Sequence, residues 1–79
     1  MKTVMLSLTP MEDMYHAADR NAQIVSSVCR VKMDIVYVGN DSMESICIPP
    51  TAIRGVVRKL RRRGFVVKAS TVNGEKTLN

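Results

Sequence analysis

The side chains best suited to binding another molecule lie in one short segment, TAIRGVVRKLRRRGF, which spans residues 51–65. The segment carries six Lys or Arg side chains and no acid, and five of the six are arginines. The planar guanidinium group of arginine binds phosphate or carboxylate oxygens through two parallel hydrogen bonds. The segment therefore predicts a surface that contacts anions.

Charge is distributed unequally along the chain. Residues 45–74 hold seven basic side chains and no acid, whereas residues 1–44 hold four bases and six acids. The helix dipole stabilises cations near a helix C-terminus by about 0.3–1 kcal/mol each, which explains two or three of them. It does not explain the whole run, because neighbouring like charges repel. We expect a binding surface made of Arg54, Arg58, Lys59, Arg61, Arg62, Arg63 and Lys68.

The scarcity of aromatic residues bears on which nucleic acid such a surface would bind. Proteins that read single-stranded RNA on a sheet stack bases on aromatic side chains. The chain has only Tyr15, Tyr37 and Phe65, and the segments 3–8 and 43–48, expected at the centre of a sheet, contain none. We expect Tyr37 to pack against its neighbours. The backbone of duplex DNA is therefore the favoured nucleic-acid partner, bound without reading of base sequence.

Residues typical of catalytic or metal sites are few and widely spaced. His16 is the only histidine, and Cys29 and Cys47 are 18 residues apart, unlike the close-spaced pairs of zinc sites. No glycine pattern typical of phosphate-binding loops occurs. We expect no enzymatic activity, no cofactor and no metal, and we expect both cysteines to pack as small apolar residues in a reducing cytosol.

The length of 79 residues predicts a single small domain, residues 1–79, whose small core would gain from self-association. No apolar run is long enough to span a membrane. The apolar run near the N-terminus is interrupted by Pro10, Glu12 and Asp13 before it reaches the length found in a signal peptide. These features predict a cytoplasmic protein.

The first half of the chain predicts a strand followed by a helix. Residues 3–8 alternate between apolar and other residues, as a half-buried strand does. Residues 9–12, TPME, match a capping box with proline at the first helical position. Apolar residues then recur at helical spacing, so we expect a helix over residues 10–29, with Glu12 and Asp13 at its start.

The second half predicts a hairpin, a helix and a strand. A hairpin of 33–38 with 43–48 would place Val38 opposite Met43 and Ile35 opposite Ile46. Prolines 49–50 end that hairpin, because proline donates no ladder hydrogen bond. A helix follows, with an inward stripe of Ile53, Val56, Val57 and Leu60 and a stop at Gly64. A strand over 65–70 and a turn at 72–75, which would fold back a short extra strand, complete the chain.

This order of elements is compatible with two folds. Strand, helix, strand, strand, helix, strand predicts an α+β ferredoxin-like domain, with a four-stranded antiparallel sheet and both helices on one face. The segment ICIPPTAIRGVVRKLRRRGFVV, followed by a VNG turn, resembles instead the helix-turn-helix and wing of winged-helix proteins, with Ile48 and Ile53 at the expected spacing. The two differ at residues 41–48, which form a strand in the first and a helix in the second.

Together these features predict a small, basic, non-enzymatic binding or regulatory protein that contacts duplex DNA through its second helix. In that interpretation the sheet and the first helix support the basic helix. The alternative is a protein–protein interaction module that docks the same helix on an acidic partner. Small bacteriophage inhibitors or adaptors are of this general kind. A third option is a subunit of an enzyme.

Overall fold

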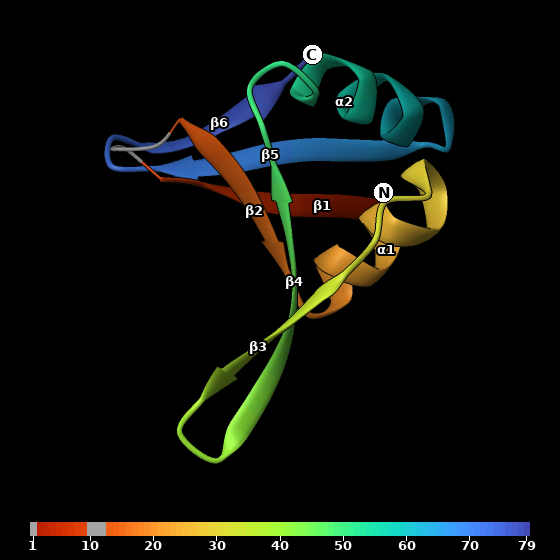
Figure 1. The fold of residues 1–79 in the computed structure, drawn as a ribbon. Helices are drawn as coiled ribbons and strands as arrows, with labels where there is room; N and C mark the ends of the chain where they lie inside the picture. The colour runs from red at the N-terminus through yellow and green to blue at the C-terminus, as the bar shows by residue number, and fades with distance from the viewer. Residues whose placement is uncertain (1, 10–12) are drawn as a thin grey trace.

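The computed structural model describes residues 2–9 and 13–79, which form a mixed α+β domain with two helices and a six-stranded sheet. The predicted α+β class and the two helices are confirmed. Both helices lie on the same side of the sheet (Figure 1). The elements are β1 Lys2–Thr9, β2 Met14–Ala18, α1 Arg20–Cys29, β3 Asp34–Val38, β4 Asp41–Ile48, α2 Ile53–Arg62, β5 Phe65–Thr71 and β6 Gly74–Leu78.

The strands are ordered β3-β4-β2-β1-β5-β6 across the sheet. Neighbours are antiparallel except β1 and β5, which are parallel, with Val4 opposite Val67. Each helix connects two parallel strands that are not adjacent: α1 links β2 to β3 across β4, and α2 links β4 to β5 across β2 and β1. The prediction of a four-stranded, wholly antiparallel sheet is wrong, because β2 is an additional strand and β1 pairs with β5 in parallel. The extra strand expected after the turn at 72–75 is present as β6.

The helix predicted over residues 10–29 is half its expected length. Residues 14–18 form β2, and α1 begins only at Arg20. The capping box falls largely on residues 10–12, which lie outside the described residues. β2 forms ladders with both β1 and β4, and this tertiary pairing overrides a local helical pattern. Asp19 makes the sharp change from strand to helix with φ 52°, and its N–H donates to the carbonyl oxygen of Glu44 at 2.9 Å.

The predicted hairpin is confirmed as β3 and β4, but its register differs by two residues. Val38 lies opposite Asp41 and Ile35 opposite Glu44, so the turn contains only Gly39 and Asn40. Gly39, with φ 62°, occupies the first central position, where type II′ turns favour glycine. Because the shift is an even number of residues, every side chain keeps its predicted face. The strand at 41–48 also rules out the winged-helix alternative, which needs a helix there.

The core lies between the sheet and the two helices. The strands contribute alternate residues, and the largest fully buried side chains are Leu6, Ile46, Ile48 and Leu60. The two helices meet at Cys29, whose thiol donates to the carbonyl oxygen of Val56 at 3.9 Å. Cys29 is therefore a core residue, as predicted. Cys47 is exposed, so the prediction that it packs in the core is wrong.

Candidate nucleic-acid interface

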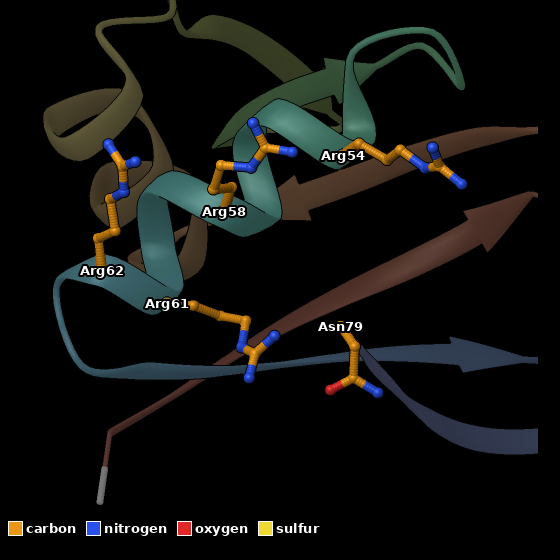
Figure 2. A pocket seen from close by; sticks show the side chains of 5 residues that line it. All are labelled: Arg54, Arg58, Arg61, Arg62 and Asn79. Carbon is orange, nitrogen blue, oxygen red and sulfur yellow. The ribbon is translucent and has the colours of Figure 1, made fainter.

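Four arginines of α2 line one surface hollow. Arg54, Arg58, Arg61 and Arg62 recur at intervals of three and four residues, which places them along one side of the helix. Together with Asn79 they line a hollow of about 530 Å³, and all five side chains are exposed (Figure 2). No acidic side chain is among the lining residues. The hollow therefore carries four guanidinium groups spaced along α2, which suits an extended ligand with several negative charges.

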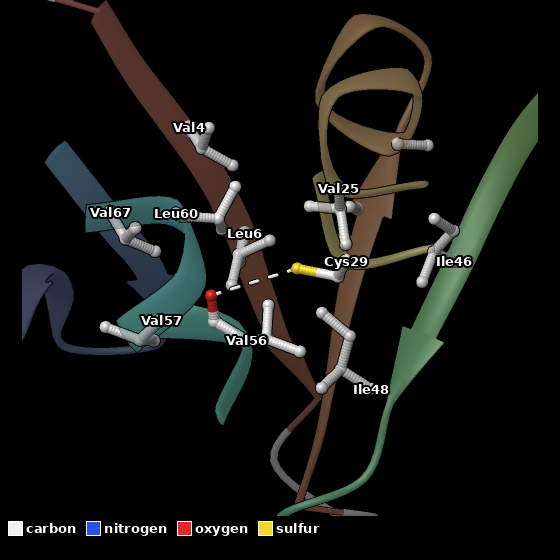
Figure 3. Close-up of a cluster of buried hydrophobic side chains, with 12 residues drawn as sticks. Val4, Leu6, Val25, Cys29, Ile46, Ile48, Val56, Val57, Leu60 and Val67 are labelled. Carbon is white, nitrogen blue, oxygen red and sulfur yellow. Dashed lines mark hydrogen bonds between the residues drawn. The ribbon is translucent and has the colours of Figure 1, made fainter. Parts of the chain in front are cut away.

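The rotation of α2 about its own axis is fixed by its apolar side. Val56, Val57 and Leu60 are buried against the sheet and α1, as the predicted inward stripe requires (Figure 3). Ile53 is only partly buried but packs against the same cluster. Since these residues and the arginines occupy opposite sides of one helix, burying the first set holds the second set towards solvent.

The first turn of α2 also favours anions. Its N-cap residue, Ala52, supplies no side-chain hydrogen bond, and no acid occupies the first turn. The first N–H groups of a helix have no intrahelical partner, and the helix dipole places partial positive charge there. Gly55 lies in this turn, and a Cβ built on it would have no heavy atom within 4 Å. The backbone beside Arg54 is therefore open to a close approach by a ligand.

The helix dipole explains the positive charge of the last turn of α2. Lys59, Arg61 and Arg62 lie there, where the negative end of the helix dipole stabilises cations. The helix ends as predicted: Gly64 adopts φ 88°, and its N–H donates to the carbonyl oxygen of Arg61 at 3.0 Å. The dipole accounts for the cations of this turn, but Arg54 and Arg58 precede it.

Three of the predicted binding residues lie outside the hollow. Lys59 lies close enough to Cys29 for its charge to act on that thiol: burial raises the pKa of Cys29, and the charge of Lys59 lowers it by less. Arg63 is the C-cap residue of α2. Lys68 lies between Val67 and Ala69 on β5, and because those two are buried beneath the helices, Lys68 points to the opposite face of the sheet. The hollow thus contains four of the seven predicted residues.

The structure also brings together residues that the sequence did not link. His16 lies on β2 and not in a helix, and it is directly opposite Cys47 on β4 and Ser7 on β1. Tyr37 does not pack as predicted, because its side chain is 75% exposed. Among residues 2–9 and 13–79, no group of three His, Cys, Asp or Glu side chains is placed to hold a metal ion. Asn79 could not have been assigned to the hollow from its position in the sequence.

Neither helix is a candidate for crossing a membrane, since within the described parts of the chain each has only 10 residues. A comparison with protein-family models and with curated proteins finds no match to this chain.

Proposed function

We propose that the protein is a non-enzymatic nucleic-acid-binding protein that contacts the phosphate backbone of duplex DNA through the arginine hollow of α2. The observation that carries the proposal is that Arg54, Arg58, Arg61 and Arg62 line one hollow along α2, with no acidic side chain among the lining residues. The helix dipole explains Arg61 and Arg62, but a helix exposed only to solvent gains nothing from adding Arg54 and Arg58 to them, because the like charges repel. A row of phosphates would relieve that repulsion.

The proposed mechanism is electrostatic. The buried side of α2 fixes its orientation, and the arginines neutralise successive phosphates and release their condensed counterions. The uncapped first turn adds N–H groups and the positive end of the helix dipole beside Arg54. Contacts of this kind set position and affinity but carry no base sequence. The protein would therefore act as a positioning or regulatory factor and would bind unrelated duplexes alike.

Gly55 supports a close approach at the same place. Glycine inside a helix costs about 0.5–1 kcal/mol of stability relative to alanine. At Gly55, however, no atom of the chain lies within 4 Å of the position that a Cβ would take, so packing within the protein does not require glycine. Its backbone conformation is helical and imposes no need for glycine. A ligand backbone that packs against the first turn would use the space that a side chain would otherwise fill.

We also infer two broader properties. The units β2-α1-β3 and β4-α2-β5 supply the element order of a ferredoxin-like domain, and β1 and β6 would then be additions, the first inserted at the centre of the sheet. The free thiols of Cys29 and Cys47 fit a reducing cytosol, which supports a cytoplasmic location.

The test is a salt series of binding to a fluorescent DNA duplex. The logarithm of affinity should fall with the logarithm of salt concentration, with a slope of about −0.9 for each phosphate contact. The double variant Arg58→Ala, Arg61→Ala should lose about two contacts and weaken binding to unrelated sequences equally. The matched control, Lys68→Ala with Lys76→Ala, removes the same charge outside the hollow and should keep the parental slope.

Two results would contradict the proposal. One is no binding by the parent protein at about 50 mM salt, where electrostatic contacts are strong. The other is a parental slope in the double arginine variant. Either result would favour the alternative, a protein partner whose carboxylates occupy the hollow, because arginine pairs equally well with carboxylates. A nuclease-resistant complex recovered from lysate, and lost in the double arginine variant, would then identify that partner.

A further inference from the structure

Exposed apolar side chains are concentrated on the β3–β4 hairpin. Ile35, Val36, Tyr37 and Met43 are 59%, 45%, 75% and 37% exposed, and of the large apolar residues described in the structure only Val72 is comparable. The hairpin extends away from the helices and the rest of the sheet (Figure 1). Ile35 and Tyr37 lie on one of its faces and Val36 and Met43 on the other. A two-stranded arm with apolar residues on both faces gains stability if a partner covers it.

β3 is also the less protected of the two sheet edges. The other edge, β6, begins with Gly74 and carries Glu75 and Lys76, charges that discourage pairing with another strand. β3 reads DIVYV and contains no lysine or proline. Exposed edge strands that lack such protection are templates for a further strand. The occupant should therefore be a β-strand.

The hairpin register determines which backbone groups of β3 are free. In a hairpin with a two-residue turn, the pair that closes the turn exchanges both of its hydrogen bonds, and such pairs then alternate along the ladder. That pair is Val38 and Asp41, so Val36 and Asp34 also bond to β4. The N–H and C=O groups of Ile35 and Tyr37 point away from β4 and are available to an added strand.

We propose that β3 pairs antiparallel with β3 of a second copy of this chain, about a two-fold axis through Val36. In this register Ile35 of each copy lies opposite Tyr37 of the other, so the free backbone groups of both strands meet. The two Val36 side chains meet at the axis. All five residues of β3 are paired, and the two sheets become one continuous sheet.

Side-chain chemistry favours a second copy and this register. Each Asp34 lies opposite position 38 of the other copy and not opposite the second Asp34, so no two carboxylates are directly opposed. The same register, continued two residues beyond β3, would place Lys32 opposite Asn40 of the other copy and beside the opposite charge of its Asp41. Ile35 of one copy pairs with Tyr37 of the other, and cross-strand pairs of an aromatic and a β-branched residue stabilise a sheet. The strand is thus complementary to itself without help from another sequence.

The dimer would complement the proposed DNA binding but does not depend on it. No residue of β3 lines the arginine hollow, so the dimer and the DNA binding can be tested independently. Two arginine hollows on one particle would bind neighbouring stretches of one duplex, which raises affinity without new contacts. A single strand edge is small for a protein interface, so we expect reversible association with a dissociation constant of about 1–100 μM.

The first test is solution mass as a function of protein concentration, measured by light scattering and sedimentation equilibrium. The parent should change from monomer to dimer as concentration rises. Val36→Lys places two like charges at the axis and should remain monomeric, with the parental circular dichroism spectrum because Val36 is exposed. Thr77→Lys adds the same charge to β6, the opposite edge, and should dimerise like the parent. A parent that is monomeric up to about 1 mM, or a Val36→Lys variant that still dimerises, overturns the proposal.

The second test examines the register in a Cys47→Ser background. Opposed residues that are not hydrogen-bonded have Cα atoms about 4.5 Å apart, within the range of a disulfide. Val36→Cys should therefore form a covalent dimer on mild oxidation. Ile35→Cys alone should crosslink much more slowly, because Ile35 faces Tyr37, but a mixture with Tyr37→Cys should crosslink readily. Equal crosslinking of Val36→Cys and Ile35→Cys would exclude this register.

Discussion

His16 of β2 and Cys47 of β4 lie directly opposite each other on the face of the sheet that the helices leave uncovered. Their neighbours in the same ladder, Ala17 and Ile46, form the adjacent pair and are buried beneath the helices. The alternation of strand residues therefore directs one cysteine to solvent, while Cys29 is enclosed between α1 and α2. The two thiols occupy different chemical environments.

This difference predicts the reactivity of the two cysteines. In the folded protein one thiol, Cys47, should react rapidly with a maleimide or disulfide reagent, and Cys29 should react only after unfolding. Thiol titration with and without urea measures both rates. Cys47→Ser should abolish the fast reaction and Cys29→Ala should leave it unchanged. Two fast thiols in the native parent would show that the interface between the helices opens.

Cys29 should also make stability depend on alkaline pH. Burial raises the pKa of its thiol above the ordinary value of 9.0, with a smaller opposing effect from the charge of Lys59. The folded state therefore holds this proton more tightly than the unfolded state, and its contribution to stability is complete below pH 9.0. That contribution is lost as the pH rises through the raised pKa.

Urea unfolding at several pH values measures this effect. The free energy of unfolding should decline above pH 9.0 more steeply for the parent than for Cys29→Ala. Cys47→Ala serves as the control and should keep the parental pH dependence. Parallel curves for the parent and Cys29→Ala would mean that the thiol ionises equally well in both states.

Substitutions on the two sides of α2 should have opposite consequences. Leu60→Ala removes a fully buried side chain and should cost about 2–5 kcal/mol of stability, a large part of the margin of a domain this small. Arg58→Ala is exposed and should change stability by less than about 0.5 kcal/mol while it weakens DNA binding. Thermal unfolding together with the binding titration separates the two effects. A loss of stability in Arg58→Ala comparable to that in Leu60→Ala would make the arginine a structural residue.

Gly55→Ala should raise stability and lower affinity. Alanine is the better helix former by about 0.5–1 kcal/mol, and the added Cβ meets no atom of the chain. If phosphates pack against the first turn, the same methyl group obstructs them. Ser27→Ala, at an exposed position of α1, is the control, because it improves helix propensity away from the hollow. An affinity equal to that of the parent in Gly55→Ala would exclude a close backbone approach there.

Elements that depend on residues close together in the sequence are predicted correctly, and those that depend on distant residues are not. The α2 stripe, its stop at Gly64 and the β3–β4 hairpin depend on neighbouring residues, and each was predicted, apart from the hairpin register. Residues 14–18 carry a helical pattern but form β2, because this strand depends on two ladders, one of them to β4 about 30 residues away.

The site followed the same rule. The basic side of α2 could be read from helical spacing, so the arginines of the hollow were predicted. The positions of Lys68 and Cys47 depend on which face of a strand is covered, and that is decided only when the helices pack. Asn79 joins the hollow through the tertiary fold alone.

The parallel pairing of β1 with β5 has a consequence for synthesis of the protein. β1 contains the first described residues of the chain, yet one of its two neighbouring strands, β5, begins at Phe65. A nascent chain therefore exposes one side of β1 until nearly all of the domain has left the ribosome. Contacts between residues so far apart in the sequence form late, and they reduce the folding rate. Synthesis of β5, and not growth of the N-terminal half of the chain, is then the event that gives β1 its second neighbouring strand.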